Sequence, residues 1–326
     1  MGRMKTFTKA QKEAFLNEFK GTIFEYRLAL VLAEKLGSLS HLLASIPPVD
    51  QKRLEEYEKA IWQLDPSLGA ALSQWPQEVA HAIFAHLSFR QGHVRWVGRE
   101  EKQQWHEADL LLEGDDQSVV PLSLKLSKEQ AFVNTKSAGI KSVLPQYFNA
   151  CPGVEAAQAQ LLDIVDRGFL TMGMELYQQL DLGIFMGRFD ERWTLPKLPG
   201  QMPEELRPYI WQYYRLPMAF LAQLFAQWND LASFKQALLP IFGFGRPDIW
   251  QVNCFYQKDP WQLKKILILP PAWAAEQIDA LAWRPYQAGD IFFNGDFPAG
   301  TIQIRAKPMN VFTVAGLKVN CALRHR

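Results

Sequence analysis

The ten residues VVPLSLKLSK, Val119 to Lys128, decide how the middle of this 326-residue chain folds. Leucine occupies every second position in their centre, which is the period of a strand that buries one face. The positions between the leucines hold Ser123 and Lys125, so the opposite face is polar. Upstream, WHEADLLLEG (105–114) has a similar pattern, and the turn-forming run Gly-Asp-Asp at 114–116 follows it. The two segments predict an antiparallel β-hairpin.

A turn centred near Asp116 sets the register of this hairpin. Residues whose numbers sum to about 232 then face each other, as in any antiparallel pair, so Asp109 lies opposite Ser123. Glu107, Asp109, Ser123 and Lys125 share one face, and the leucines at 110, 112, 122, 124 and 126 share the other. We expect the leucines in the core and a carboxylate beside an ammonium group on the other face. A shift of one residue would remove this arrangement.

The aspartate and the lysine have two interpretations at this stage. They form either a compact site for a divalent cation, a water and a phosphate, or an ordinary cross-strand ion pair on a solvated face. Ion pairs of the second kind are common on protein surfaces. The residues of the hairpin alone leave both interpretations open.

The composition indicates a folded, water-soluble chain. Hydrophobic residues make up 48% and aromatic residues 13% of the sequence, enough for one large domain or two packed ones. We expect no signal peptide and no membrane span, because no apolar run approaches about 20 residues. The three cysteines are far apart, which argues against a disulfide scaffold or a structural zinc site. A reducing cytoplasm is the expected location.

The order of helical and strand-like patterns predicts a mixed α/β fold without regular βαβ alternation. We expect four regions: an N-terminal helical region at 1–93 that includes the first core helix, a hairpin core at 94–150, a helical insert at 151–247, and C-terminal strands at 248–326 that complete the sheet. Within the insert, a helix is expected from Pro203 with kinks at Pro208 and Pro217. The last strand is expected to run through VFTVAGLKVNCALR with a bulge at Gly316.

Basic charge is concentrated in two segments of an otherwise acidic chain. The formal net charge is +1, but residues 301–326 carry +5 and residues 118–142 carry +3, so the remainder carries −7. Such asymmetry is typical of a site for a polyanion, although solvated basic faces would give the same numbers.

Three charged groups in one order resemble a nuclease superfamily. A glutamate on the expected first helix, Glu25 in GTIFEYRLALVLAEKLG, precedes Asp109 at a strand start and Lys125 in the next strand. The pattern is similar to the PD-(D/E)xK superfamily over roughly residues 21–145. LSLKLSKEQAFVNTKSAG and the terminal IRAKPMNVFTVAGLKVNCALR resemble type II restriction endonucleases, most nearly the HaeIII type. The resemblance implies a restriction-endonuclease-like core: a central mixed sheet flanked by helices, here with a helical insert.

Two positions depart from the superfamily pattern. Ala108 stands where a proline is expected, and Ser123 stands where an acidic residue is expected two positions before the lysine. The second departure removes one carboxylate. The resemblance then implies that Asp109, Glu25 and the main-chain carbonyl of Leu124 hold one Mg²⁺.

The resemblance implies metal-assisted phosphodiester hydrolysis with Glu25, Asp109, Ser123 and Lys125 in the catalytic site. Mg²⁺ would polarise the scissile phosphate and lower the pKa of a bound water. Lys125 would orient that water and offset the charge that builds on the phosphorane, and Ser123 would donate a hydrogen bond to the cluster. The alternative for Glu25 is a solvated helix residue paired with Arg27 or Lys35.

Two segments offer side chains for DNA contact. The stretch SKEQAFVNTKSAGIKSVL suits phosphate binding at a loop that leads into a helix, and it could equally be a plain loop and helix start. In the terminal strands, alternating basic and amide side chains could read base edges, or could be a solvated face over an apolar core. The expected DNA-binding residues are Lys128, Asn134, Lys136, Ser137, Lys141, Arg305, Lys307, Lys318, Asn320 and Arg324.

The sequence therefore predicts a sequence-specific, Mg²⁺-dependent endonuclease for double-stranded DNA, of the restriction type and acting as a homodimer. No motif for a nucleotide cofactor is present. One alternative is an RNA-directed or abortive-infection toxin nuclease that uses the same site. Another is a catalytically inactive nuclease fold that binds DNA, which the serine at position 123 would explain.

Overall fold

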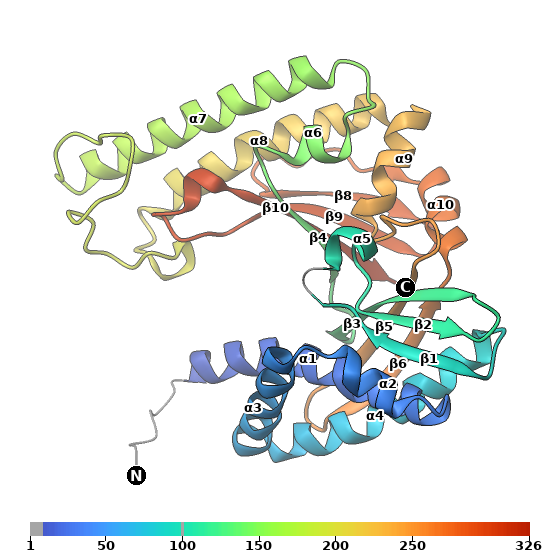
Figure 1. Ribbon diagram of the computed structural model, residues 1–326. Helices are drawn as coiled ribbons and strands as arrows, with labels where there is room; N and C mark the ends of the chain where they lie inside the picture. The colour runs from blue at the N-terminus through green and yellow to red at the C-terminus, as the bar shows by residue number, and fades with distance from the viewer. Residues whose placement is uncertain (1–8, 99–100) are drawn as a thin grey trace, which may run out of the picture. The chain divides into compact units, whose positions relative to one another are not determined.

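The protein is described by a computed structural model, which covers residues 9–98 and 101–326 (Figure 1). The fold is mixed α/β, as predicted, with two five-stranded sheets flanked by helices. The chain divides into two compact units, residues 1–133 with 244–273 and residues 134–243 with 274–326. Each unit is described separately below.

The first unit contains the predicted hairpin. Its elements are α1 (Lys9–Lys35), α2 (Leu39–Ser45), α3 (Pro48–Leu64), α4 (Pro66–His86), β1 (Gly92–Trp96), α5 (Lys102–Trp105), β2 (Leu110–Gly114), β3 (Val119–Lys128), β5 (Trp250–Gln257) and β6 (Gln262–Leu269). The strands form a mixed sheet in the order β1-β2-β3-β5-β6, in which only β3 and β5 are parallel. A parallel pair needs a long crossover connection. Here the connection from β3 to β5 includes the whole segment 134–243, which belongs to the second unit.

The predicted register of the hairpin is confirmed. Leu110 pairs with Leu122 and Glu113 pairs with Val119, so the paired numbers sum to 232. The leucines at 110, 112, 122 and 124 are buried in one hydrophobic cluster with residues of α1 and α4. Burying these side chains, at roughly 1.5–3 kcal/mol each, fixes which face of the hairpin meets the helices.

Helices α1 to α4 gather on this apolar face of the sheet (Figure 1). Asp65 begins α4: its carboxylate accepts a hydrogen bond from the Leu68 amide at 3.0 Å, and Pro66 occupies the first helical position. Both features are typical of helix starts. They turn the chain sharply between α3 and α4, so that both helices can pack on α1.

The second unit has its own sheet and its own helices. Its elements are β4 (Val133–Gly139), α6 (Val143–Tyr147), α7 (Val154–Gln179), a 3₁₀ turn (Pro199–Gln201), α8 (Arg207–Trp228), α9 (Ala232–Ile241), β7 (Ala282–Trp283), β8 (Phe292–Phe297), β9 (Gly300–Lys307), a 3₁₀ turn (Val314–Gly316) and β10 (Lys318–His325). Helix α10 (Pro271–Asp279) spans the boundary between the units in the chain. The sheet order is β4-β10-β9-β8-β7.

Three local predictions differ from the structure. A single central sheet was expected, but of the C-terminal strands only β5 and β6 join the sheet of the hairpin, and the later strands form the second sheet with β4. The last strand does not bulge at Gly316; local hydrogen bonds form a 3₁₀ turn there, and β10 begins at Lys318. Helix α8 begins at Arg207 rather than Pro203, and Pro208 lies in its first turn, where a missing N–H disrupts no helical hydrogen bond.

Within the described residues, none of the helices combines the length and the apolar character that crossing a bilayer requires. The longest, α1 and α7, are amphipathic helices that pack against other elements of their own units.

A lysine is buried on α1 at the edge of the first unit's core. Lys20 is 8% exposed, and its ammonium donates to Asn17 Oδ1 at 2.7 Å and to the Tyr256 hydroxyl. Burial, together with the smaller effects of the nearby charges of Lys128 and Lys258, lowers the pKa of Lys20 to about 8. The native state therefore releases this proton more easily than the unfolded chain does.

This pKa predicts a pH-dependent stability. Below pH 8 both states hold the proton, but between about pH 8 and 10.5 the unfolded chain holds more protons, so the free energy of unfolding rises with pH. We expect wild type to gain stability relative to Lys20→Met across this interval, measured by urea unfolding, with Lys264→Met as an exposed control. A flat difference between wild type and Lys20→Met would contradict the assignment.

Gly92 gives a second prediction for this sheet. It begins β1 with φ of 150°, and a Cβ there would collide with the backbone carbonyl oxygen of Glu113. We expect Gly92→Ala to lower the free energy of unfolding by about 1–3 kcal/mol. Gly21→Ala, on an open face of α1, should raise it by about 0.5–1 kcal/mol. Equal stability of the two variants in urea would show that β1 does not begin this way.

Candidate functional site

Asp109 lies at the point where the polar face of the hairpin begins. Its amide donates to the Leu122 carbonyl at 2.7 Å, and its own carbonyl accepts from the Val97 amide at 3.2 Å, so neighbouring strands on both sides hold its backbone. Its carboxylate Oδ2 accepts a hydrogen bond from the Leu124 amide at 2.8 Å and lies 3.9 Å from Lys125 Nζ. The predicted juxtaposition of this acid and this amine is confirmed. Both side chains are largely buried, 15% and 24% exposed.

The backbone amide and carbonyl of Leu124 are on the side of β3 that faces Asp109. In a strand, the N–H and C=O of one residue point to the same neighbour. Because the Leu124 amide reaches the Asp109 carboxylate, the Leu124 carbonyl is directed to the same side of β3. The carboxylate and the carbonyl are two oxygen groups that a hard cation accepts.

Glu25 and Asp109 line one cavity of about 130 Å³ in the first unit. Glu25 is half-buried on α1, which packs against β1 and β3. The lining residues are Thr22, Glu25, Asp50, Arg53, Trp96, Val97, Gly98 and Asp109. The structure therefore brings together two carboxylates that are 84 positions apart in the chain. Glu107 is placed differently: its carboxylate lies against Gly245, where an added Cβ would be 2.8 Å from Oε2.

Ser123 is fully buried, and within the described part of the chain its hydroxyl has no hydrogen-bond partner. It pairs with Gln251 across the parallel strands β3 and β5, and Lys125 pairs with Asn253. Both amide side chains are fully buried as well. Ser123, Gln251 and Asn253 therefore make the surroundings of Lys125 polar. Buried polar groups on a sheet face need hydrogen-bond partners or ligands.

Sequence reasoning missed four residues of this region: Gln251, Asn253, Asp50 and Arg53. The first two alternate with Val252 and Cys254 in a strand, and this alternation was a usable signal once β5 was placed beside β3. Asp50 lies in the first turn of α3 and Arg53 three residues later, and nothing local in the sequence connects them to the hairpin. Only the packing of α3 on α1 brings them to the cavity.

The fit of a metal ion rests on few ligands. Among residues 9–98 and 101–326, no group of three or more histidine, cysteine, aspartate or glutamate side chains is arranged to hold a metal ion. The set implied by the resemblance is smaller: the carboxylates of Asp109 and Glu25 with the Leu124 carbonyl. These are all oxygen groups, which suits Mg²⁺, an ion that keeps several waters and needs few protein ligands. The donor chemistry therefore fits the ion.

No protein-family model, curated protein or solved structure matches the chain significantly. The geometry of this site is therefore the basis for any functional argument.

The basic segment after β3 has a different structure from the one predicted. Residues 133–139 are strand β4, not a loop that leads into a helix, because Val133, Thr135 and Ala138 are buried while Asn134 and Ser137 are exposed. Sheet pairing with β10 thus overrides the polar composition.

The lysines of this segment lie in different surroundings. Lys128 is exposed at the end of β3. Lys136 is half-buried, with Nζ 5.4 Å from the ring centre of Tyr147, and Lys141 forms an ion pair with Asp166. The ion pair reduces the charge that Lys141 could offer to a phosphate.

The C-terminal basic residues share one face of the second sheet, as predicted. Lys318 pairs with Lys307, Asn320 with Arg305, and Arg324 with Thr301, so the predicted side chains project from the same face. Lys307, Lys318 and Arg324 are exposed there, whereas Arg305 is half-buried and Asn320 is buried, contrary to its predicted contact with DNA. The opposite face carries buried apolar residues such as Ile302, Ile304, Val319, Cys321 and Leu323. Burial raises the pKa of the Cys321 thiol to about 12, so this cysteine stays protonated.

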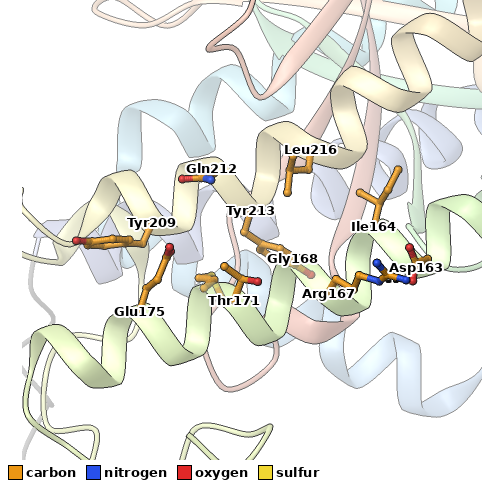
Figure 2. Close-up of a pocket in the computed structure, with 11 residues that line it drawn as sticks. Asp163, Ile164, Arg167, Gly168, Thr171, Glu175, Tyr209, Gln212, Tyr213 and Leu216 are labelled. Atoms are coloured by element: carbon orange, nitrogen blue, oxygen red, sulfur yellow. Dashed lines mark ion pairs between the residues drawn. The ribbon is translucent and has the colours of Figure 1, made fainter.

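A second cavity lies between α7 and α8 (Figure 2). Its volume is about 230 Å³, and its floor is formed by Gly168, Tyr213 and other neutral side chains. Its one guanidinium, Arg167, is paired with Asp163 at 2.6 Å, and Glu175 lies toward the other end (Figure 2). Arg167 is 80% exposed, so its guanidinium lies at the solvent side of this cavity.

Two buried hydroxyls, Ser123 in the first unit and Thr135 in the second, give a test of side-chain packing. Ser123→Ala removes a hydroxyl that lacks a partner among the described residues and should raise the free energy of unfolding by about 1 kcal/mol. Thr135→Val removes a hydroxyl that donates to the Ile241 carbonyl at 2.6 Å and lies 3.1 Å from the Cys321 carbonyl, and should lower it by about 1–2 kcal/mol. Urea unfolding compares them. A marked loss of stability in Ser123→Ala would mean that the serine is structurally bonded.

Proposed function

We propose that the chain is a Mg²⁺-dependent endonuclease that cleaves double-stranded DNA, of the restriction type. One observation carries the proposal: the Asp109 carboxylate lies beside Lys125 Nζ and the backbone of Leu124, and it lines a cavity together with Glu25. Two carboxylates that suit a hard cation, with a lysine ammonium within 4 Å of the Asp109 carboxylate, form a set of groups suited to hydrolysis of a phosphodiester. The mixed sheet flanked by helices is the fold class that the resemblance implies.

Each side chain has a defined task in this proposal. The Asp109 and Glu25 carboxylates, with the Leu124 carbonyl, would hold the ion, which when bound supplies a Lewis acid for the phosphate and the attacking water. Lys125 holds the attacking water by hydrogen bonding and stabilises the negative charge of the transition state. Its position is set by the strand and by the attraction of Asp109. Ser123 is deep in the sheet and acts on the site only through its neighbours.

Binding of the DNA would use the basic face of the second sheet. Arg305 is the side-chain type that reads guanine, whereas its neighbour Asn320 is only 7% exposed and would not reach a base edge from this position. Lys307, Lys318 and Arg324 would contact phosphates. A homodimer would present two such faces to a palindromic site. The protein would act in the cytoplasm.

A second candidate is a DNA-binding protein without nuclease activity. It is favoured by Ser123, because the position where the pattern needs a third carboxylate holds a buried neutral hydroxyl. An RNA-directed nuclease would use the same charged groups, so the nature of the degraded substrate distinguishes it.

Plasmid cleavage tests the proposal. We expect purified protein with Mg²⁺ to cut supercoiled plasmid into discrete bands, and Asp109→Ala and Lys125→Ala each to reduce the rate about 100-fold or more, because each removes a group that acts on the transition state. Lys235→Ala and Asp279→Ala break a surface ion pair of 3.4 Å in the second unit and should cleave as wild type does.

The other outcomes have defined meanings. Retarded DNA migration without cleavage would support the DNA-binding candidate, and degradation of RNA alone would support the RNA-directed one. Cleavage that is unchanged in Asp109→Ala would place the activity elsewhere.

A further inference from the structure

The cavity that Asp109 and Glu25 line contains an arginine that the proposed mechanism does not use. Arg53, on α3, is the one guanidinium among its described lining residues. We infer that Arg53 is a substrate-binding residue of this site, which holds a non-bridging oxygen of a DNA phosphate, and that Asp50 is its positioning residue. The inference rests on the proposed function, because it takes a phosphodiester as the substrate.

Asp50 fixes the position of Arg53 within one turn of helix. Its Oδ1 lies 2.9 Å from an Nη atom of Arg53, three residues further along α3, and Asp50 itself is buried. Asp50 is also in the first turn of the helix, where the helix dipole stabilises a negative charge. A buried carboxylate that is held in this way restricts the flexible arginine to one orientation, so less entropy is lost when a ligand binds.

Arg53 has donor capacity that the described residues leave unused. Its Nε is buried and, in the described part of the chain, has no hydrogen-bond partner. A guanidinium offers five N–H donors in a planar fork, and phosphate oxygens match this fork in pairs. The Arg53 side chain is 32% exposed and lines the cavity, so an oxygen that enters the cavity can reach it.

The charges around the cavity favour a role for Arg53 in binding the substrate phosphate. Three of its lining side chains are carboxylates, Glu25, Asp50 and Asp109, and they would repel a phosphate. Lys125, on β3, places a positive charge 3.9 Å from the Asp109 carboxylate. The guanidinium of Arg53 both offsets Asp50 and places positive charge on the α3 side, so a phosphate would meet cationic groups from two directions. A purely structural ion pair would need only the contact with Asp50.

Binding of a small phosphate ligand separates these two roles. We propose isothermal titration of the full chain with thymidine 3′,5′-bisphosphate in Ca²⁺, which favours binding over cleavage. We expect Arg53→Met to weaken binding about tenfold or more, because it removes a charged hydrogen bond. Arg53→Lys keeps the charge and should weaken binding less. Asp50→Asn should weaken it slightly, because Arg53 keeps its charge but loses its anchor. Arg27→Met is the matched control: Arg27 pairs with Glu58, is 34% exposed, and lies outside the cavity.

Kinetics of plasmid cleavage give the second measurement. Loss of a phosphate contact in Arg53→Lys should raise KM more than it lowers kcat, an effect that a structural ion pair would not produce. The lysine variant retains the ion pair with Asp50 and so remains informative if Arg53→Met does not fold.

The outcomes distinguish the inference from the proposed function. Cleavage by wild type with bisphosphate affinity equal in Arg53→Met and wild type overturns the inference and leaves the function standing. Absence of cleavage, together with affinity lost in Arg53→Met and retained in Arg27→Met, supports a phosphate site and rejects the nuclease. No binding to wild type also overturns the inference.

Discussion

The hydrogen bond from the Leu124 amide to the Asp109 carboxylate is the constraint on which the candidate site depends. It extends the pairing of β2 and β3 by one further contact, from side chain to backbone, beyond the last ladder pair. It turns the carboxylate toward Lys125 and also directs the Leu124 carbonyl to the same side of the strand. A charged hydrogen bond of this kind is about twice as strong as a neutral one. The orientation of the acid is therefore part of the fold rather than a property of a flexible surface side chain.

The hairpin and its register could be predicted from the sequence because both depend on local features. The turn near Asp116 and the alternating leucines determine which residues face each other, and the structure agrees at every pair from Leu110 to Glu113. The adjacency of Asp109 and Lys125 followed from that register. Period and turn chemistry are short-range signals, so a single sequence contains them.

The remainder of the site depends on contacts between distant segments. Asp50 and Arg53 reach the cavity only because α3 packs on α1, and no periodicity reports that packing. The parallel pairing of β3 with β5 joins segments more than a hundred residues apart, so Gln251 and Asn253 could not be assigned to the polar face in advance. The division into two sheets was missed for a second reason: β4 has a polar composition that hides its strand character.

The route of the chain through β3 and β5 affects how this protein can be made. Every charged group of the candidate site is present once residue 133 has been synthesised, but the central strand β3 still lacks its parallel neighbour on one edge. That neighbour is translated only after the intervening segment 134–243 of the second unit. An unpaired inner strand is a template for wrong association. A nascent chain, or a fragment cut between the units, would thus hold the complete set of acids and bases on a sheet that is open along its middle.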